Sequence, residues 1–284
     1  NCSWTPRCSH CDVSLTYHKG QQALICHYCG AVYKMPEICP ECKTPTLKNL
    51  GYGTERIEEE VSEIFPEASI ARMDLDTTRG KKSYERIISA FEANQTNILI
   101  GTQMVSKGLD FGNVSLVGIL NADNLLNYPD FRAYEKAYQL MMQVSGRAGR
   151  QNKQGTVLLQ TSHPGNPIIN FVKQNDYDSF YKTQIDERKI FRYPPFFRII
   201  NIIIRAREEI MAEKAAEVFS ASLKVSFGSR VLGPSKPPVS RIQSLYIRQI
   251  TLKIENQASI LKVREIIRQS QISTLNNRSN VIST

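Results

Sequence analysis

The chain has 284 residues, of which 41% are hydrophobic and 22% charged, and its formal net charge is +9. This length and apolar content suffice for two or three domains with buried cores. The sequence has no apolar run near the roughly 18 residues that a membrane span needs and no charged-then-apolar start typical of a secretory signal. We therefore expect a cytoplasmic protein with no membrane-bound part.

The positive charge is concentrated in the last third of the chain. Residues 188–284 hold 17 lysines and arginines against six acidic residues, whereas residues 1–187 hold 19 against 21. A basic domain of this kind neutralises phosphates and releases counterions, which favours nucleic acid as a partner. A basic surface that is merely solvated is the alternative.

All seven cysteines lie near the start of the chain. Six of them form Cys-x-x-Cys pairs, and each four-cysteine zinc site needs two such pairs. The pairs are Cys8 with Cys11, Cys26 with Cys29, and Cys39 with Cys42, and Cys2 is left over as half of a fourth pair whose partner would precede Asn1. The pattern predicts a zinc module over residues 1–48 that is disordered without metal.

Two alternatives concern these cysteines. Disulfides are disfavoured because nothing in the sequence indicates export. His10, His18 and His27 lie among the cysteines and are expected to be bystanders, since four thiolates already fill a site. His27 would be the substitute if one ligand were lacking.

Residues 51–160 alternate between apolar strands and amphipathic helices, which predicts a parallel α/β sheet. Thr54 is the expected N-cap of the first helix. The predicted helices are 55–65, 81–93 and 133–144, and the predicted strands are 69–74, 97–101, 114–120 and 155–160. Asp74 and Asp76 then follow a strand, but they lack the further ligands of a metal site, so we expect a structural or DNA-proximal role.

Two segments carry the pattern of a nucleotide site. Residues 101–111, Gly-Thr-Gln-Met-Val-Ser-Lys-Gly-Leu-Asp-Phe, form a loop at the end of a predicted strand, where α/β proteins place functional groups. Residues 143–150, Gln-Val-Ser-Gly-Arg-Ala-Gly-Arg, present two arginines three positions apart. Planar guanidinium groups at this spacing can bind the charge of a transferring phosphoryl group. A Gly/Arg turn that only solvates a helix end is the alternative.

These segments resemble motif V and the arginine-finger motif of superfamily 2 helicases. Over nearly its whole length the chain resembles the PriA family of replication-restart helicases, also called primosomal protein N′. The resemblance implies that residues 49–187 form a RecA-like helicase lobe 2 with the cysteine module inserted near its start, and that the first strand of the lobe is absent. The site residues that it implies are Arg147, Arg150 and Gln143 for catalysis, Gly108 and Asp110 for nucleotide, and Thr102 and Lys107 for the DNA backbone.

The resemblance also implies how the cysteines divide. The family binds two zinc ions with eight cysteines, so one site would be Cys8, Cys11, Cys26 and Cys29. The other would be Cys2, Cys39 and Cys42, with one ligand missing from the chain. A module of this kind is expected to help couple ATP use to strand separation.

The last part, residues 188–284, has a different pattern. A turn-rich entry at 192–196 precedes strand 199–205, helix 210–227, strand 230–232, strand 244–255, helix 257–271 and a last strand at 280–284. This order predicts a small α+β domain of split β-α-β, ferredoxin-like topology, and the family's domain here binds DNA.

Within this domain, a basic, proline-rich loop leads into a strand that could serve as a single-strand platform, with Lys236, Arg241, Tyr246 and Arg248 as the candidate contacts. Stacking on an aromatic ring contributes about 1–3 kcal/mol per base. Arg248 stands where the family often has an aromatic residue, so Tyr246 is the better stacking candidate. An ordinary strand with both side chains in solvent is the alternative.

The chain contains no Gly-x-x-x-x-Gly-Lys-Ser/Thr loop and no Asp-Glu-x-His box, which bind phosphates and Mg²⁺ in helicase lobe 1. We therefore expect the C-terminal fragment of an ATP- and Mg²⁺-dependent 3′–5′ DNA helicase of replication restart, inactive by itself and clipped within its last strand. The implied partners are forked and single-stranded DNA, primosome and helicase-loading proteins and single-strand DNA-binding protein, and we expect a monomer. A non-catalytic, zinc-containing DNA-binding module is the alternative.

Overall fold

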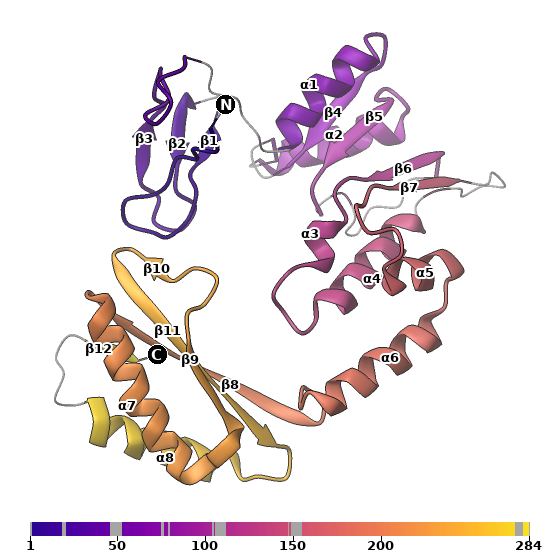
Figure 1. Ribbon diagram of the computed structural model, residues 1–284. Coiled ribbons are helices and arrows are strands. Elements are labelled where there is room, and N and C mark those ends of the chain that lie inside the picture. Colours follow the sequence, from indigo (N-terminus) through magenta and orange to yellow (C-terminus); the bar gives the residue numbers. More distant parts are fainter. Residues whose placement is uncertain are drawn as a thin grey trace. The chain divides into compact units, whose positions relative to one another are not determined.

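The computed structural model describes residues 2–18, 21–45, 53–74, 77–78, 80–103, 105, 112–146, 148, 155–275 and 281–283. The chain divides into two compact units, shown in Figure 1. One unit joins Asn1–Asn49 to Glu187–Thr284, and the other is Leu50–Asp186. The predicted first and third domains therefore share one unit, although more than a hundred residues separate them in sequence.

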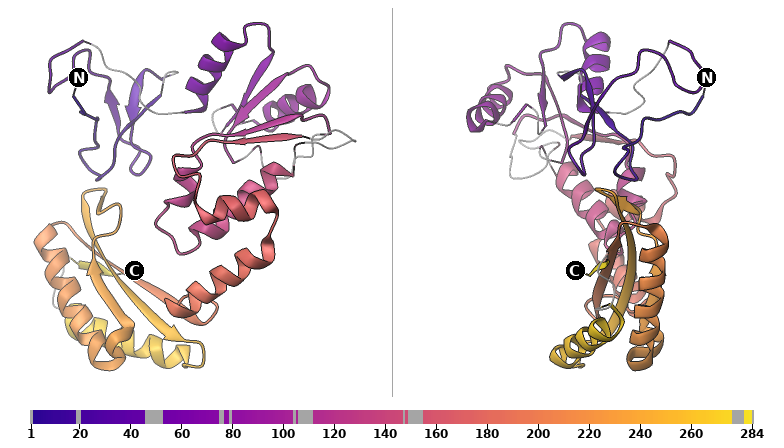
Figure 2. Two further views of the ribbon diagram at one scale, coloured as in Figure 1. Left: turned by 45° about the vertical axis from the view of Figure 1, so that its right-hand side comes forward. Right: turned by 90° about the vertical axis from the view of Figure 1, so that its left-hand side faces the viewer.

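The cysteine module is built on three very short antiparallel strands, β1 (Thr16–His18), β2 (Ala23–Ile25) and β3 (Val32–Lys34). Figure 2 shows these strands and the loops around them from two further sides. Strands of three residues bury little apolar surface, and the most deeply buried side chains of the module are Cys8, Cys11, Cys26 and Cys39, together with Leu24 of β2. The core of this module is thus made largely of thiols.

The second unit has the predicted alternation of strands and helices. Its strands pair in parallel, β4 with β5 and β6 with β7, as two separate two-stranded sheets among the described residues. The parallel pairing was predicted, but the single sheet was not found. The elements are α1 (Thr54–Ile64), β4 (Ile70–Met73), α2 (Lys81–Glu92), β5 (Ile98–Gly101), β6 (Leu116–Ile119), α3 (Asp123–Leu126), α4 (Ala133–Ser145), β7 (Thr156–Leu159), α5 (Pro167–Gln174) and α6 (Tyr177–Ile190), whose last residues enter the first unit.

Two local predictions in this unit were incomplete. The N-cap of α1 is Gly53, and the Thr54 hydroxyl donates instead to Asp74 Oδ2 at 2.6 Å. Helix α5 was not predicted, although its signals are present: the Asn166 side chain accepts from the Ile168 N–H, Pro167 occupies the first turn, and Asn175 ends the helix in the left-handed region.

The C-terminal domain has the predicted ferredoxin-like order. Strand β11 pairs with β9 and β8, and β8 pairs with β12, all antiparallel, so the four main strands run β9-β11-β8-β12. A two-residue strand, β10, extends the sheet as a hairpin that the sequence did not predict. The elements are β8 (Phe197–Ala206), α7 (Glu209–Phe227), a 3₁₀ turn η2 (Gly228–Arg230), β9 (Val231–Ser235), β10 (Arg241–Ile242), β11 (Leu245–Glu255), α8 (Ile260–Leu275) and β12 (Val281–Ser283).

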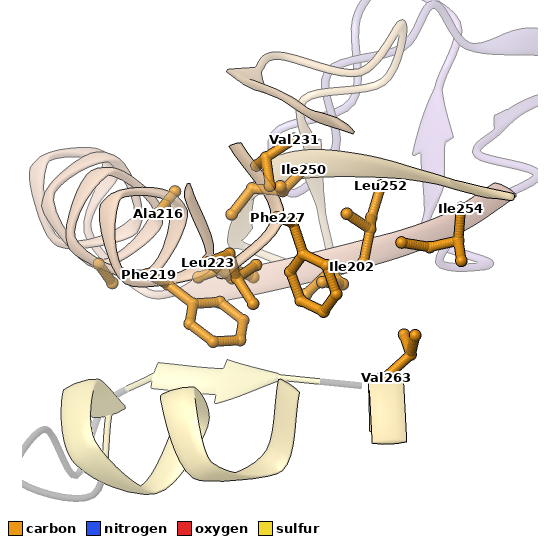
Figure 3. Close-up of a cluster of buried hydrophobic side chains, with 12 residues drawn as sticks. Ile202, Ala216, Phe219, Leu223, Phe227, Val231, Ile250, Leu252, Ile254 and Val263 are labelled. Atoms are coloured by element: carbon orange, nitrogen blue, oxygen red, sulfur yellow. The ribbon is translucent and has the colours of Figure 1, made fainter. Parts of the chain in front are cut away.

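The core of this domain lies between the sheet and its helices. Alternate residues of β8 and β11 point into it, and Figure 3 shows Phe219, Leu223 and Phe227 of α7 packed beneath them, with Val263 of α8 nearby. The strand residues that meet them are Ile202, Ile204, Ile250, Leu252 and Ile254. None of the residues of this core is a metal ligand, so we expect the domain to fold without metal. Among the described helices, none combines the length and hydropathy needed to cross a membrane.

Candidate metal centres

The first cluster brings together the thiols of Cys8, Cys11, Cys26 and Cys29, whose Sγ atoms all lie within 4.8 Å of one another. The Sγ atoms of Cys8 and Cys29 are 3.6 Å apart. With Zn–S bonds of about 2.3 Å, a tetrahedral site has S···S edges of about 3.8 Å, so the spacing fits a zinc ion. Burial raises the pKa of the Cys11 thiol to about 12, and a bound cation is what makes such a thiol ionise.

The second cluster consists of Cys2, Cys39 and Cys42, again with Sγ atoms within 4.8 Å. Cys2 Sγ lies 3.5 Å from Cys39 Sγ and 3.2 Å from Cys42 Sγ. The Thr44 hydroxyl, 3.1 Å from Cys42 Sγ, and the Thr44 main chain lower the pKa of Cys42 to about 6. Three convergent thiols fit a zinc ion that has a fourth ligand from elsewhere.

The same backbone turn shapes all three Cys-x-x-Cys pairs. The N–H of the first cysteine donates to the carbonyl five residues on: Cys8 to Val13, Cys26 to Ala31 and Cys39 to Thr44, at 2.9–3.0 Å. In the last two pairs the residue after the second cysteine is left-handed, with φ of 75° at Gly30 and 56° at Lys43. This turn aims both thiols of a pair at one point.

The structure therefore gathers the two cysteine sets that the resemblance implied. All seven cysteines are free thiols, so the disulfide alternative is not seen. Within the part of the chain that the structure describes, neither cluster includes a histidine. The rings of His18 and His27 instead lie against each other, with centroids 5.2 Å apart.

The predicted nucleotide loops are only partly described. Lys107, Gly108, Asp110, Arg147 and Arg150 lie outside the described residues. Thr102 and Gln143 are both exposed.

Gly101, at the start of the first loop, is tightly enclosed. A Cβ there would come within 2.1 Å of Val105 Cγ2 and 2.6 Å of the Met73 carbonyl oxygen. The loop thus begins beside the carboxyl end of the neighbouring parallel strand, which requires glycine at this position.

Asp74, one of the two carboxylates that follow the first predicted strand, has hydrogen-bond and ion-pair partners within the protein. It accepts hydrogen bonds from Thr54 and Thr77 and pairs with Arg72 at 3.2 Å. Burial raises the pKa of its carboxyl, but Thr54, Thr77 and Arg72 together lower it below its ordinary value. The carboxylate therefore ties α1 to the end of β4. Asp76 lies outside the described residues.

Asp123 is held in a similar way at the end of the second strand pair. The Ser162 hydroxyl and N–H and the Thr161 hydroxyl donate to its carboxylate, and these bonds, led by the Ser162 hydroxyl, lower its pKa to about 2. Because the unfolded value is about 3.9, this stabilisation is present above about pH 4 and is lost as the pH falls toward 2. The carboxylate borders a hollow of about 340 Å³ between α3 and the loop after β7.

We expect an NMR titration of the Asp123 carboxyl to have a midpoint near pH 2. Replacing Ser162 with alanine should move that midpoint up toward 4, because it removes the main donor. His163→Ala is the matched control, since His163 Nδ1 lies 3.8 Å away and contributes least to the shift. An unchanged midpoint in Ser162→Ala would contradict this assignment.

Arg248 requires a correction among the predicted DNA contacts. Its side chain is 1% exposed, and its guanidinium donates to Glu213 and, at 2.9 Å, to Glu209. Burial lowers the pKa of Arg248, but Glu213 and Glu209 raise it above its usual value. A guanidinium that is buried and neutralised by two carboxylates is not placed to bind a phosphate, so the structure argues against this contact.

The other three predicted contacts keep part of their surface in solvent, and Arg241 and Tyr246 are half-buried. Lys236 is largely exposed, with Nζ 2.7 Å from Glu209 Oε1. The Arg241 guanidinium lies over the Tyr246 ring, 5.8 Å from its centroid, and the two residues face each other across the β10–β11 hairpin. This stacked pair is an aromatic and cationic surface of the kind that binds nucleic acid.

A polar group that the sequence did not reveal lies on the other face of the sheet, away from the core. The Thr251 hydroxyl donates to Asn201 Oδ1 at 2.9 Å, and Gln249 Nε2 lies 3.3 Å from both. Lys253 Nζ, on the same face, lies 3.8 Å from the centroid of the Tyr193 ring. The strand alternation could have identified this face, because all four strand residues have odd numbers whereas the core positions are even.

Comparison with known proteins agrees with this arrangement. Three segments match family models: residues 8–34 match the PriA DNA helicase Cys-rich region domain, residues 49–152 the helicase conserved C-terminal domain, and residues 189–283 the primosomal protein N C-terminal domain.

Relatives match across these segments. The chain is 42% identical over 262 residues to the replication restart protein PriA of Bacillus subtilis, covering 92% of the chain and 32% of that protein. Identity is 36% over 275 residues with its namesake from Synechocystis, covering 95% of the chain and 33% of the relative. The identity to the replication restart protein PriA of Haemophilus influenzae is 37% over 284 residues, covering 99% of the chain and 38% of that protein. The chain thus spans about a third of the length of these relatives, and it belongs to the PriA family of replication restart proteins.

Proposed function

We propose that this chain forms the C-terminal part of an ATP-dependent 3′–5′ DNA helicase that acts in replication restart and primosome assembly at stalled forks in the cytoplasm. The observation that carries the proposal is the match of residues 49–152 to a helicase C-terminal domain, flanked in the same chain by two domains described for PriA. A helicase lobe between a cysteine-rich module and a basic domain favours an enzyme that moves on DNA over a passive binder.

In this proposal, residues 143–150 and 101–111 form one wall of the nucleotide site. Arg147, Arg150 and Gln143 would stabilise the charge that develops during phosphoryl transfer, and Gly108 and Asp110 would contact the nucleotide. Support comes from the enclosed Gly101, which begins the loop 101–111 at the carboxyl end of β5, where α/β proteins bind ligands. ATP and Mg²⁺ would be bound mainly by the lobe that holds the phosphate-binding loop.

We further propose that the module binds two zinc ions. Cys8, Cys11, Cys26 and Cys29 would hold one, and Cys2, Cys39 and Cys42 would hold the other with a fourth ligand from outside the described residues. When bound, zinc supplies folding energy rather than chemistry at a substrate. Metal analysis of the purified chain by mass spectrometry should find at least one zinc per chain, and a metal-free, folded module would contradict the assignment.

The DNA partner is proposed to be forked and single-stranded. Thr102 and Lys107 would contact its backbone in the helicase lobe, and Lys236, Arg241 and Tyr246 would bind it in the C-terminal domain. Support comes from the net charge of residues 188–284 and from the stacked Arg241 and Tyr246 side chains. Primosome and helicase-loading proteins and single-strand DNA-binding protein would be the protein partners of a monomer.

Two arginine substitutions distinguish contact from stability in the C-terminal domain. We expect Arg241→Ala to weaken single-strand binding and to lower the salt slope of the binding constant by about 1, with the unfolding midpoint unchanged. Arg248→Ala should instead cost about 1.5–3 kcal/mol of stability, since Glu213 loses its charged donor and Glu209 is left with Lys236 alone. Binding titrations at several salt concentrations and urea unfolding measure both. The reverse pattern, with Arg248→Ala changing the salt slope, would contradict these roles.

The experiment that tests the proposed function is ATP hydrolysis with and without single-stranded DNA. Residues 1–284 alone should not turn over ATP, because the sequence has no phosphate-binding loop. The protein that also carries such a lobe should show DNA-stimulated turnover. DNA-independent turnover, or none, by the longer protein would argue against a translocating helicase.

A further inference from the structure

The β10–β11 hairpin of the C-terminal domain lies against the first cysteine pair, within one compact unit. Two main-chain hydrogen bonds join them: the Asp12 N–H donates to the Arg241 carbonyl at 2.8 Å, and the Ser244 N–H donates to the His10 carbonyl at 2.7 Å. Ile242, at the hairpin, packs against the buried cluster formed by Cys8, Cys11 and Cys26. Segments more than two hundred residues apart in sequence thus share backbone hydrogen bonds and a common apolar contact.

A third main-chain bond ends on a thiol of the first cluster. The Gln243 N–H donates to Cys11 Sγ at 3.3 Å, and Cys11 is 1% exposed. Within the cysteine module itself, the His10 N–H donates to Cys8 Sγ at 3.4 Å in a comparable way. Donors of this kind orient a metal-bound thiolate and disperse its charge, so the hairpin contributes to Cys11 what the cysteine turn contributes to Cys8.

Side chains reinforce the contact on both sides. The Ser240 hydroxyl donates to Asp12 Oδ2 at 2.9 Å, and Ser244 Oγ lies 3.2 Å from His10 Nδ1. His10, between the two cysteines of the pair, and Asp12, directly after the second, therefore hold the hairpin. This explains why His10 lies beside the cysteines without joining either cluster.

The turn of the hairpin has an unfavourable sequence for its backbone. Gln243 and Ser244 have φ of 51° and 62°, and they are the two residues between β10 and β11. Two-residue hairpins with both residues in the left-handed region strongly favour Asn-Gly or Asp-Gly. Both N–H groups of this turn are engaged by the cysteine module, so the docked module compensates for a turn that the local sequence disfavours.

We infer that the Gln243–Ser244 turn belongs to the metal site formed by Cys8, Cys11, Cys26 and Cys29, as a positioning element supplied by the C-terminal domain. The inference rests on the proposed zinc binding. It follows that metal occupancy and docking of the C-terminal domain are coupled in both directions. Loss of metal releases the hairpin, and loss of the hairpin weakens metal retention. Because Arg241 and Tyr246 lie on the same hairpin, the metal also sets the position of a proposed DNA contact.

The direct test uses the full chain loaded with ¹¹³Cd in place of zinc and labelled with ¹⁵N. A scalar coupling between cadmium and the Gln243 amide proton is expected, since it passes only through an N–H···S–Cd hydrogen bond. The metal content of the same sample separates the two proposals. Bound cadmium without this coupling overturns the inference and leaves the metal site standing, whereas a chain that binds no metal overturns the metal proposal itself.

A second measurement uses release of zinc to a coloured chelator. Ile242→Asp should undock the hairpin, and release from the first site should become about tenfold faster or more, the range seen when outer contacts of a metal site are removed. Val225→Asp is the matched control on the same domain, because Val225 is 89% exposed, and its release should equal that of the unmodified chain. Hydrogen exchange in β8 and α7 should be the same in all three proteins. Equal release from Ile242→Asp and the unmodified chain would overturn the coupling.

Discussion

Replacing Cys26 with serine should remove one zinc ion from the chain and unfold residues 21–34, while the C-terminal domain stays folded. Cys26 is completely buried and lies in the first cluster, and the strands around it have only three residues each. In zinc-finger peptides the metal contributes about 10–16 kcal/mol to folding, far more than such strands can replace. Native mass spectrometry measures the lost ion, and hydrogen exchange locates the unfolded segment.

Val32→Ser is the matched control for this substitution. Val32 lies on β3 in the same module and is 64% exposed, so we expect full metal content and unchanged protection. The core built on Phe219, Leu223 and Ile250 has no metal ligand, and its slow-exchanging amides should persist in Cys26→Ser. Protected amides in β2 and β3 of a metal-free chain would show that the metal is not structural.

The second large effect is expected at Arg150. In the protein that carries the phosphate-binding lobe, Arg150→Ala should lower DNA-stimulated ATP turnover by about 10³-fold, the effect typical of arginine fingers. The guanidinium would stabilise charge that develops only in the transition state, so turnover should fall far more than nucleotide affinity. Steady-state kinetics and nucleotide binding separate these two quantities.

Arg132→Ala is the corresponding control in the same lobe. Arg132 is about half exposed and pairs with Glu135 three residues on, which is worth little at a surface. The ATP turnover of the Arg132→Ala protein should therefore match that of the unmodified protein. Turnover in Arg150→Ala equal to that of Arg132→Ala would remove Arg150 from the catalytic site.

Strong periodic patterns explain which parts of the fold were predictable. Helix α4 and strands β8 and β11 begin and end within two residues of their predicted positions, because their apolar residues recur at helical or alternating spacing over ten or more residues. The order of elements was then enough for the ferredoxin-like topology. The Cys-x-x-Cys spacing was enough to predict metal-binding thiols, because it is a local geometric requirement of the metal. The division of the cysteines into the two observed clusters came from the family resemblance.

The parts that were missed depend on pairing and burial. Arg248 has the same parity on β11 as Ile250, Leu252 and Ile254, which face the core. Strand alternation thus indicates an inward position, whereas its charge had suggested an exposed one. Only the approach of Glu209 and Glu213 from α7 makes that position tolerable for a charge. The contact of Gln243 with Cys11 spans 232 positions and uses a backbone N–H, so no residue type could reveal it.

Strand separation by the intact protein is the most direct test of the proposed helicase. A forked DNA with a 3′ single-stranded arm should be unwound by the zinc-loaded protein in the presence of ATP and Mg²⁺, and unwinding should stop with a non-hydrolysable nucleotide. Tight DNA binding with no ATP-dependent unwinding would contradict the proposal and would identify instead a non-catalytic, zinc-containing DNA-binding module.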